Sequence, residues 1–275
     1  MATVAENFGG TGREVDVLSG TPRAHAIDRW IYVFTAASFI VVTLAGFIPD
    51  SLGKIAAVQA GQRPPFPIVL HMHAVLMGSF LLLLFTQTWL MATGRRAQHM
   101  RLGALGMVLA PLLVIVGFIL APTMYHQVWE GSLHAPPGIR EQLQARVPVL
   151  DDILLLQMRI GILFPLFLAI GLKARGTNAG MHKRMMILAT VMAIPASVDR
   201  ITWLPTTMPA SALTPDLYTF LMITPMLLWD VIRNRRIHEA YWIWLAVNLS
   251  FAIFVHTAWD TPWWHATARQ IMGVG

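Results

Sequence analysis

The sequence predicts an all-α fold, a bundle of seven transmembrane helices. Of its 275 residues, 56% are hydrophobic and only 12% are charged, whereas a soluble domain carries roughly 25% charged residues. The apolar residues gather in seven segments, each close to the ~20 residues that a helix needs to cross a bilayer. Ten Trp and thirteen Phe supply aromatic side chains of the kind that anchor such helices at the membrane interfaces.

The seven segments follow one another along residues 30–260. Their approximate limits are 30–48, 68–93, 102–121, 153–172, 185–204, 213–232 and 240–258. Residues 1–29 are mixed and polar, with no cleavable signal peptide evident, so we expect a cytoplasmic extension followed by an uncleaved signal anchor. Residues 261–275 are expected to form a tail on the outer side, with two tryptophans at the interface.

Short basic turns predict the orientation of the bundle. They lie between segments two and three, four and five, and six and seven, and their basic residues are Arg95, Arg96, Arg101, Lys173, Arg175, Lys183, Arg184, Arg233, Arg235 and Arg236. The positive-inside rule places these turns and the N-terminus in the cytoplasm and the C-terminus outside, in a bacterial inner membrane. The net charge of +6 is then explained by topology and anionic lipid, and no nucleic-acid partner is expected.

The connection between the third and fourth segments is the longest one predicted on the outer side, residues 122–152. It contains GIREQLQARV, residues 138–147, in which Ile139, Leu143 and Val147 recur every four residues. This period is typical of an amphipathic helix. We therefore expect a short helix lying on the outer membrane surface.

Histidines occupy equivalent places in the predicted topology. Each cytoplasmic turn ends in one that opens the next helix: His99, His182 and His238. On the outer side, His71 and His73 are two residues apart, which separates them by about 200° around a helix. We expect His73, the deeper of the two, to face the bundle. Contact with lipid headgroups would equally explain the turn histidines.

Several ionisable residues fall inside the predicted segments, where each costs on the order of 3 kcal/mol. Arg159 and Asp199 lie at similar depths, and we expect them to form an ion pair inside the bundle. His256 closes the seventh segment at the level of His73. Arg200 is a second cation of the outer half.

Two neutral imidazoles from different helices, with cations for the propionates, meet the needs of a b-type haem site. The sequence offers an outer pair, His73 with His256, beside Arg159 and Arg200. It also offers an inner pair, His99 with His182. The absence of cysteine excludes covalent c-type haem, Fe–S clusters and thiolate metal sites. A redox protein binding haem b, with a quinone as a possible partner, is the first functional hypothesis.

Two other functions remain open. His71, His73, Asp199 and His256 can supply ligands for zinc or another divalent ion on the outer side, where Asp151, Asp152 and Asp260 also lie. Three such ligands and an activated water would make a membrane hydrolase. The third hypothesis is an accessory subunit of a larger membrane complex, whose histidines contact lipid or partner chains.

Two stretches resemble a group of bacterial integral-membrane proteins of unassigned function. They are HMHAVLMGSFLLLLFTQTWLMATGRRAQHMRLG, residues 71–103, and HKRMMILATVMAIPASVDR, residues 182–200. The group has an HxH helix, an H-x-R-L-G turn and an H-K-R-x-M turn, and the resemblance covers most of residues 30–260. It implies the fold and topology without an activity.

More loosely, the layout is similar to cytochrome b561-type proteins, whose core helices carry histidine pairs near both membrane faces. That resemblance implies ligand roles for His73 and His99 on successive helices and for His182 on a later one. Its fourth ligand is expected on the fourth segment, which has Gln157, Met158 and Arg159 instead. His256 of the seventh segment takes this place on geometric grounds alone.

Overall fold

The computed structural model describes residues 16–19 and 25–274, and in them the chain is all-α, as predicted. A short 3-10 helix, η1 (Val17–Ser19), precedes the α-helices. These are α1 (Ile27–Gln59), α2 (Ile68–Ala92), α3 (Arg96–His134), α4 (Ile139–Ala174), α5 (Ala179–Val191), α6 (Pro195–Val198), α7 (Leu213–Asn234), α8 (Glu239–Ala258) and α9 (Pro262–Ile271). Most of the predicted N-terminal extension, including Arg13 and Arg23, lies outside the described residues.

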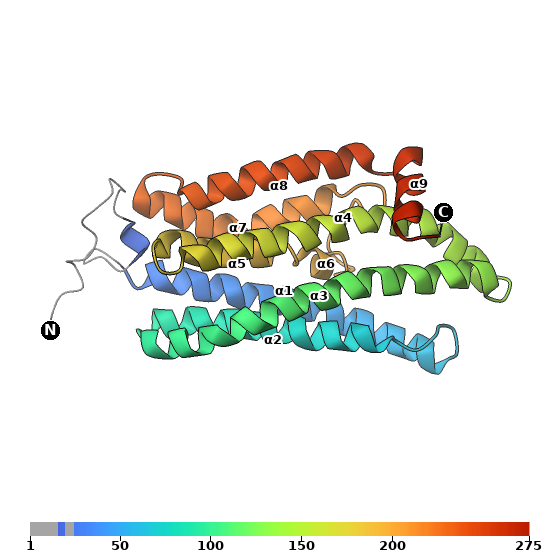
Figure 1. Ribbon diagram of the computed structural model, residues 1–275, viewed down its shortest axis with the longest axis horizontal. Coiled ribbons are helices and arrows are strands. Elements are labelled where there is room, and N and C mark those ends of the chain that lie inside the picture. Colours follow the sequence, from blue (N-terminus) through green and yellow to red (C-terminus); the bar gives the residue numbers. More distant parts are fainter. Residues whose placement is uncertain (1–15, 20–24, 275) are drawn as a thin grey trace.

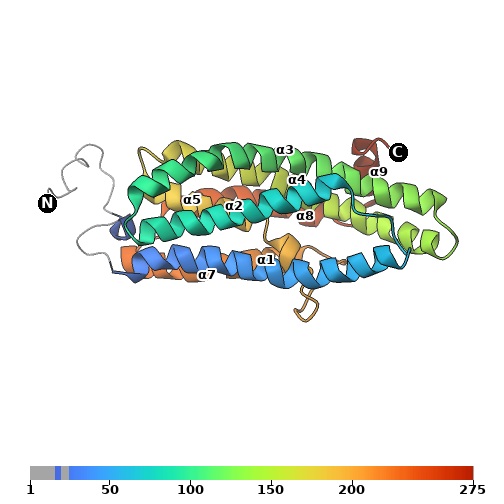
Figure 2. The same cartoon turned by 90° about the horizontal axis from the view of Figure 1, so that it is seen from below.

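The long helices run side by side along one axis (Figures 1 and 2). α1 packs between α2 and α7, and α4 packs between α3 and α5. α8 lies against α5 and α4, on the side of the bundle away from α2. η1 lies at one end of the bundle and α9 at the other (Figure 1).

Five of the described helices are long and apolar enough to cross a membrane: α1, α2, α3, α4 and α8. Their outer faces expose large apolar side chains, such as Leu44 on α1, Val75 and Leu82 on α2, and Phe118 on α3. Soluble proteins rarely expose such surfaces, so lipid contact explains them. The chain is therefore a multi-pass membrane protein.

The fifth and sixth predicted segments look different in the structure. α5 has only 13 residues and stops at Val191, and turns then lead to the four-residue α6, which begins at Pro195. α7 has 22 residues but carries Asp216, Asp230 and Arg233. α5 is the centre of the core, with Met185, Ile187 and Leu188 fully buried. Burial by protein, rather than exposure to lipid, explains how these elements tolerate breaks and charges.

The predicted outer loop, residues 122–152, is almost entirely helical instead. α3 continues to His134 and α4 begins at Ile139, so that the connection shrinks to residues 135–138. The stretch 138–147, expected to be a separate surface helix, forms the first turns of α4 and packs on α3. A Cβ built on Gly131 would lie 2.6 Å from Cδ1 of Leu143, so the four-residue apolar period reflects this helix–helix contact. Gly138, with a φ of 86°, makes the turn possible.

Candidate functional site

The turn histidines of α3 and α5 are brought together. The ring centroids of His99 and His182 are 6.4 Å apart, with an interplanar angle of 79°. Nδ1 of His182 lies 2.8 Å from the carbonyl oxygen of Gly171 on α4. Such a bond fixes the imidazole orientation and leaves Nε2 as the ligand atom, as in many metal and haem sites.

Next to this pair lies a buried amide that the sequence analysis missed. Both polar side-chain atoms of Gln87, on α2, are buried and lack a hydrogen-bonding partner among the described residues. The imidazole of His99 interacts with the backbone of Gln87, but its buried Nδ1 atom has no well-aligned hydrogen-bonding partner among the described residues. Each unsatisfied buried polar group costs about 1–3 kcal/mol. The cluster therefore has the polar groups to receive a further molecule.

The other members of this site come from neighbouring elements. Nε2 of Gln87 would lie 3.5 Å from a Cβ built on Gly103 of α3, so α2 and α3 approach closely here. Arg175, at the end of α4, is near enough to act electrostatically on His182. The site thus combines two imidazoles, one amide and one cation from four helices. A glutamine within an apolar run was the only sequence signal for Gln87.

The structure does not assemble the predicted outer pair. His73 points toward α3, since its Cε1 atom would lie 3.9 Å from a Cβ built on Gly117. His256 of α8 instead lies with Nε2 2.9 Å from Oδ2 of Asp216 on α7. α2 and α8 occupy opposite sides of the bundle (Figure 1). The sequence predicts how deep each histidine lies along its helix, but not the direction in which its side chain points around the bundle.

The predicted partner of Arg159 is also wrong. Its guanidinium bonds to Asp216, not to Asp199, so that Asp216 joins Arg159 of α4 to His256 of α8. Arg200 lies in a different cluster, where Nε is 3.3 Å from Oδ2 of Asp50 on α1. Asp199 and Arg200 follow α6, and the break before α6 turns them away from α4.

The four metal ligands proposed from the sequence are likewise dispersed. His71 is exposed and packs on the ring of Phe66, with ring centroids 6.0 Å apart. His73, Asp199 and His256 belong to three other environments. In the described part of the chain, the group with metal-ligand spacing is Asp152, Asp260 and His265. It contains two aspartates singled out from the sequence and a histidine that was not.

A groove of about 350 Å³ lies between α7 and α8. Its walls are mainly apolar, with Asp216, His256, Thr257 and Asn248 as its polar members, and the apolar lining residues are Phe220, Leu245, Leu249, Ala252 and Ile253. Oδ1 of Asn248 is buried and has no partner within the described ranges.

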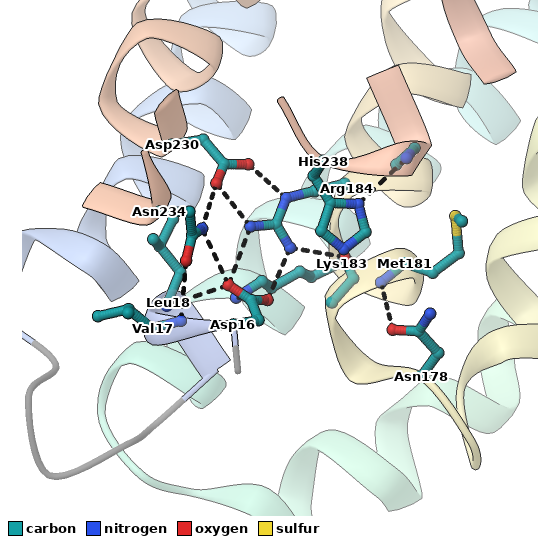
Figure 3. A network of polar contacts seen from close by, with 12 residues as sticks. Asp16, Val17, Leu18, Asn178, Met181, Lys183, Arg184, Asp230, Asn234 and His238 are labelled. Atoms are coloured by element: carbon teal, nitrogen blue, oxygen red, sulfur yellow. Dashed lines mark hydrogen bonds and ion pairs between the residues drawn. The ribbon is translucent and has the colours of Figure 1, made fainter. Parts of the chain in front are cut away.

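The end of the bundle near η1 is held by an ion network around Arg184 (Figure 3). This fully buried guanidinium bonds to Asp230 of α7 and to Asp16, which precedes η1, at 2.8 Å from Nη1 to Oδ2. Asn234 bonds both carboxylates. The network ties the start of the described chain to α5 and α7.

His238, the third turn histidine, belongs to this network and not to the His99 site. Its Nδ1 accepts a hydrogen bond from the backbone N–H of Ala240 at 3.1 Å, capping α8. Burial, with the nearby positive charge of Arg184, lowers the pKa of His238 to about 4. The histidines at the equivalent turn positions therefore differ: His99 and His182 lie together, whereas His238 caps α8 within the ion network.

No known protein family, curated protein or solved structure matches this chain.

Proposed function

We propose that this protein is a seven-span redox protein of the bacterial inner membrane that binds haem b between His99 and His182. The observation that carries the proposal is the approach of these two rings, from α3 and α5, beside unsatisfied Gln87. Two imidazoles from separate helices are the usual axial ligands of a b-type cytochrome. The similarity in layout to cytochrome b561-type proteins favours the same function.

The residues around His99 and His182 are of types that suit haem b. Gly171 holds the His182 ring through its Nδ1 atom. Arg175 is a cation suited to a propionate, and Gln87 offers both a donor and an acceptor. Haem b bound there would exchange single electrons, and the protein would hold it near the inner face of the membrane.

A visible absorption spectrum of protein purified after haem-replete expression tests this proposal. We expect a Soret band with reducible α and β bands, and its loss in His99→Ala and in His182→Ala. His134→Ala is the matched control, because His134 lies at the far end of α3 with its side chain 75% exposed. Absence of the bands from the wild type, or their persistence in both variants, would overturn it.

For the topology, we propose that α5–α6 and α7 complete seven crossings and that the N-terminus is cytoplasmic. The basic turns support this orientation. Because the chain has no cysteine, single cysteines report sidedness without background. Pro137→Cys, in the α3–α4 turn, should react with a membrane-impermeant maleimide from outside, and Ala97→Cys should react only after the membrane is opened. The reverse pattern would invert the topology.

We propose that the quinone partner binds in the groove between α7 and α8. Its apolar walls suit a ring with an isoprenoid tail, and His256 with Asp216 and Asn248 offer donors and acceptors to carbonyl or hydroxyl oxygens. Small-molecule sites commonly combine an apolar lining with a few polar groups in this way.

A further inference from the structure

At the end of the bundle opposite η1, α9 follows α8 and packs against α4 (Figure 1). This places Asp152 of α4, Asp260 of the α8–α9 turn and His265 of α9 together. One ligand atom from each lies within 4.8 Å of the other two. Nε2 of His265 is already 3.3 Å from Oδ1 of Asp260, a separation that two ligands on one small cation would have. None of these residues belongs to the proposed haem site.

The imidazole of His265 is oriented from behind by a buried carboxylate. Asp151, which is fully buried, lies with Oδ2 3.2 Å from Nδ1 of His265. The hydroxyl of Tyr125 donates to Oδ1 of Asp151 at 2.5 Å. A carboxylate bound to one ring nitrogen leaves the other directed at the metal, which is the usual arrangement around ligating histidines.

The turn that carries Asp260 is fixed by its own bonds. The backbone N–H of Asp260 donates to Oδ1 of Asp152 at 2.9 Å. Asp260 has a φ of 53°, and Thr261 caps α9 by accepting from the N–H of Trp264 at 3.2 Å. Nε1 of Trp264 donates to the carbonyl oxygen of Asp151 at 2.7 Å. Helix α9 is thereby held against α4 at the height of the three candidate ligands.

The charges around the cluster also suit a divalent cation. Arg269 lies with Nε 3.4 Å from Oδ2 of Asp151 and balances that carboxylate. Asp152 and Asp260 then remain as two negative charges facing one imidazole. Nitrogen and carboxylate oxygen together suit Zn²⁺ and Mn²⁺ better than an all-oxygen cation such as Ca²⁺.

We propose that Asp152, Asp260 and His265 bind one divalent transition-metal ion at the outer end of the bundle. Three protein ligands leave coordination positions for water or substrate, which is typical of catalytic rather than closed structural sites. The side chain of Asp260 is 77% exposed, so the ion enters from the aqueous side and a bound water is accessible there. Asp151 and Tyr125 are positioning residues, because they reach the metal only through His265.

The test uses full-length protein carrying a tag without histidines, stripped with a chelator and then titrated with Zn²⁺ and with Mn²⁺. Calorimetry and metal analysis should give about one ion per chain. Asp260→Asn should weaken binding at least ~10-fold, the scale of losing one metal contact or its support. Because Asp260 is exposed, this variant keeps its fold, which the thermal unfolding of the apoprotein verifies. His265→Ala should abolish binding.

The matched control is His134→Ala, which removes an exposed histidine of the same end of the bundle, outside the cluster. It should bind the ion as tightly as the wild type. A stoichiometry near zero in the wild type would overturn the proposal, as would equal affinity in wild type and Asp260→Asn. Tyr125→Phe should weaken binding while leaving the stoichiometry unchanged, and no change in affinity would remove its positioning role.

Discussion

Replacing Asp230 with Asn should destabilise the protein strongly. In the structure Arg184 and Asp230 both have 0% exposed side chains and share two bonds, from Nε and Nη2 of the guanidinium. The amide keeps the shape of the carboxylate and removes its charge. Breaking a buried ion pair by removing one partner costs roughly 3–5 kcal/mol. Because Asp16 still faces Arg184, we expect about 3 kcal/mol, the lower end of that range.

This loss of stability can be measured as a decrease in the melting temperature, Tm. In a chain of this size each kcal/mol corresponds to roughly 2–4 °C, so Asp230→Asn should lower the Tm by about 6–12 °C. Thermal unfolding in detergent, followed through the fluorescence of the ten tryptophans, provides the assay. Asp16→Asn should give a smaller decrease, since the side chain of Asp16 is 14% exposed and Asp230 remains in place.

Glu130→Gln supplies the comparison. Glu130 pairs with His134 at 3.6 Å, but the two side chains are 61% and 75% exposed. Surface pairs of this kind contribute at most about 1 kcal/mol, so the Tm should change by no more than roughly 4 °C. If Asp230→Asn shifts the Tm no more than Glu130→Gln does, the buried ion pair between Arg184 and Asp230 does not stabilise the fold.

Three further predictions concern pH, packing and the groove. The pKa of His238 is about 4 in the folded protein, against an ordinary value of 6.5, so the unfolded chain takes up the extra proton first as the pH falls. The free energy of unfolding should therefore be highest above pH 6.5 and fall between pH 6.5 and 4. The fall should be smaller in His238→Asn, which Tm measured against pH will show. Gly46→Ala should lower the Tm, because its Cβ would overlap the carbonyl oxygen of Ser197, whereas Gly53→Ala on the same helix meets nothing within 4 Å and should not. Leu249→Trp, which fills the groove, should remove most of the quinone that co-purifies, while Ile232→Trp on the exposed face of α7 should retain it; equal retention would place the quinone elsewhere.

The sequence predicted the fold class well because lipid imposes a simple rule: apolar runs of sufficient length become helices. It failed at 122–152 because polar residues there lie in helices that extend past the apolar core of α3 and α4. Hydropathy marks only the part of a helix that lies in lipid, and the helix itself continues beyond that part. α5 was misjudged for the converse reason, since a buried helix can end early, here at Val191, while its sequence stays apolar.

For the sites, the depth of a side chain along its helix could be predicted from the sequence, but the direction in which it points around the bundle could not. His99 and His182 came together because both open helices at the same end of the bundle, and α4 packs against both α3 and α5. Arg159 was paired with the wrong aspartate because Asp199 and Asp216 both lie toward the end of the bundle predicted to be outer. His265 was missed because it was assigned to an outer tail, and only the return of α9 onto α4 brings it to Asp152.

The contact between Asp16 and Arg184 spans 168 positions of the chain. During synthesis Asp16 emerges long before α5 and α7, which hold its partners Arg184, Asp230 and Asn234. The segment around η1 therefore has no binding place until those helices are assembled. Its docking must follow the packing of α5 against α7. A shortened chain that starts after Asp16 would complete its helices, but the guanidinium of Arg184 would keep only one of its two carboxylate partners, Asp230.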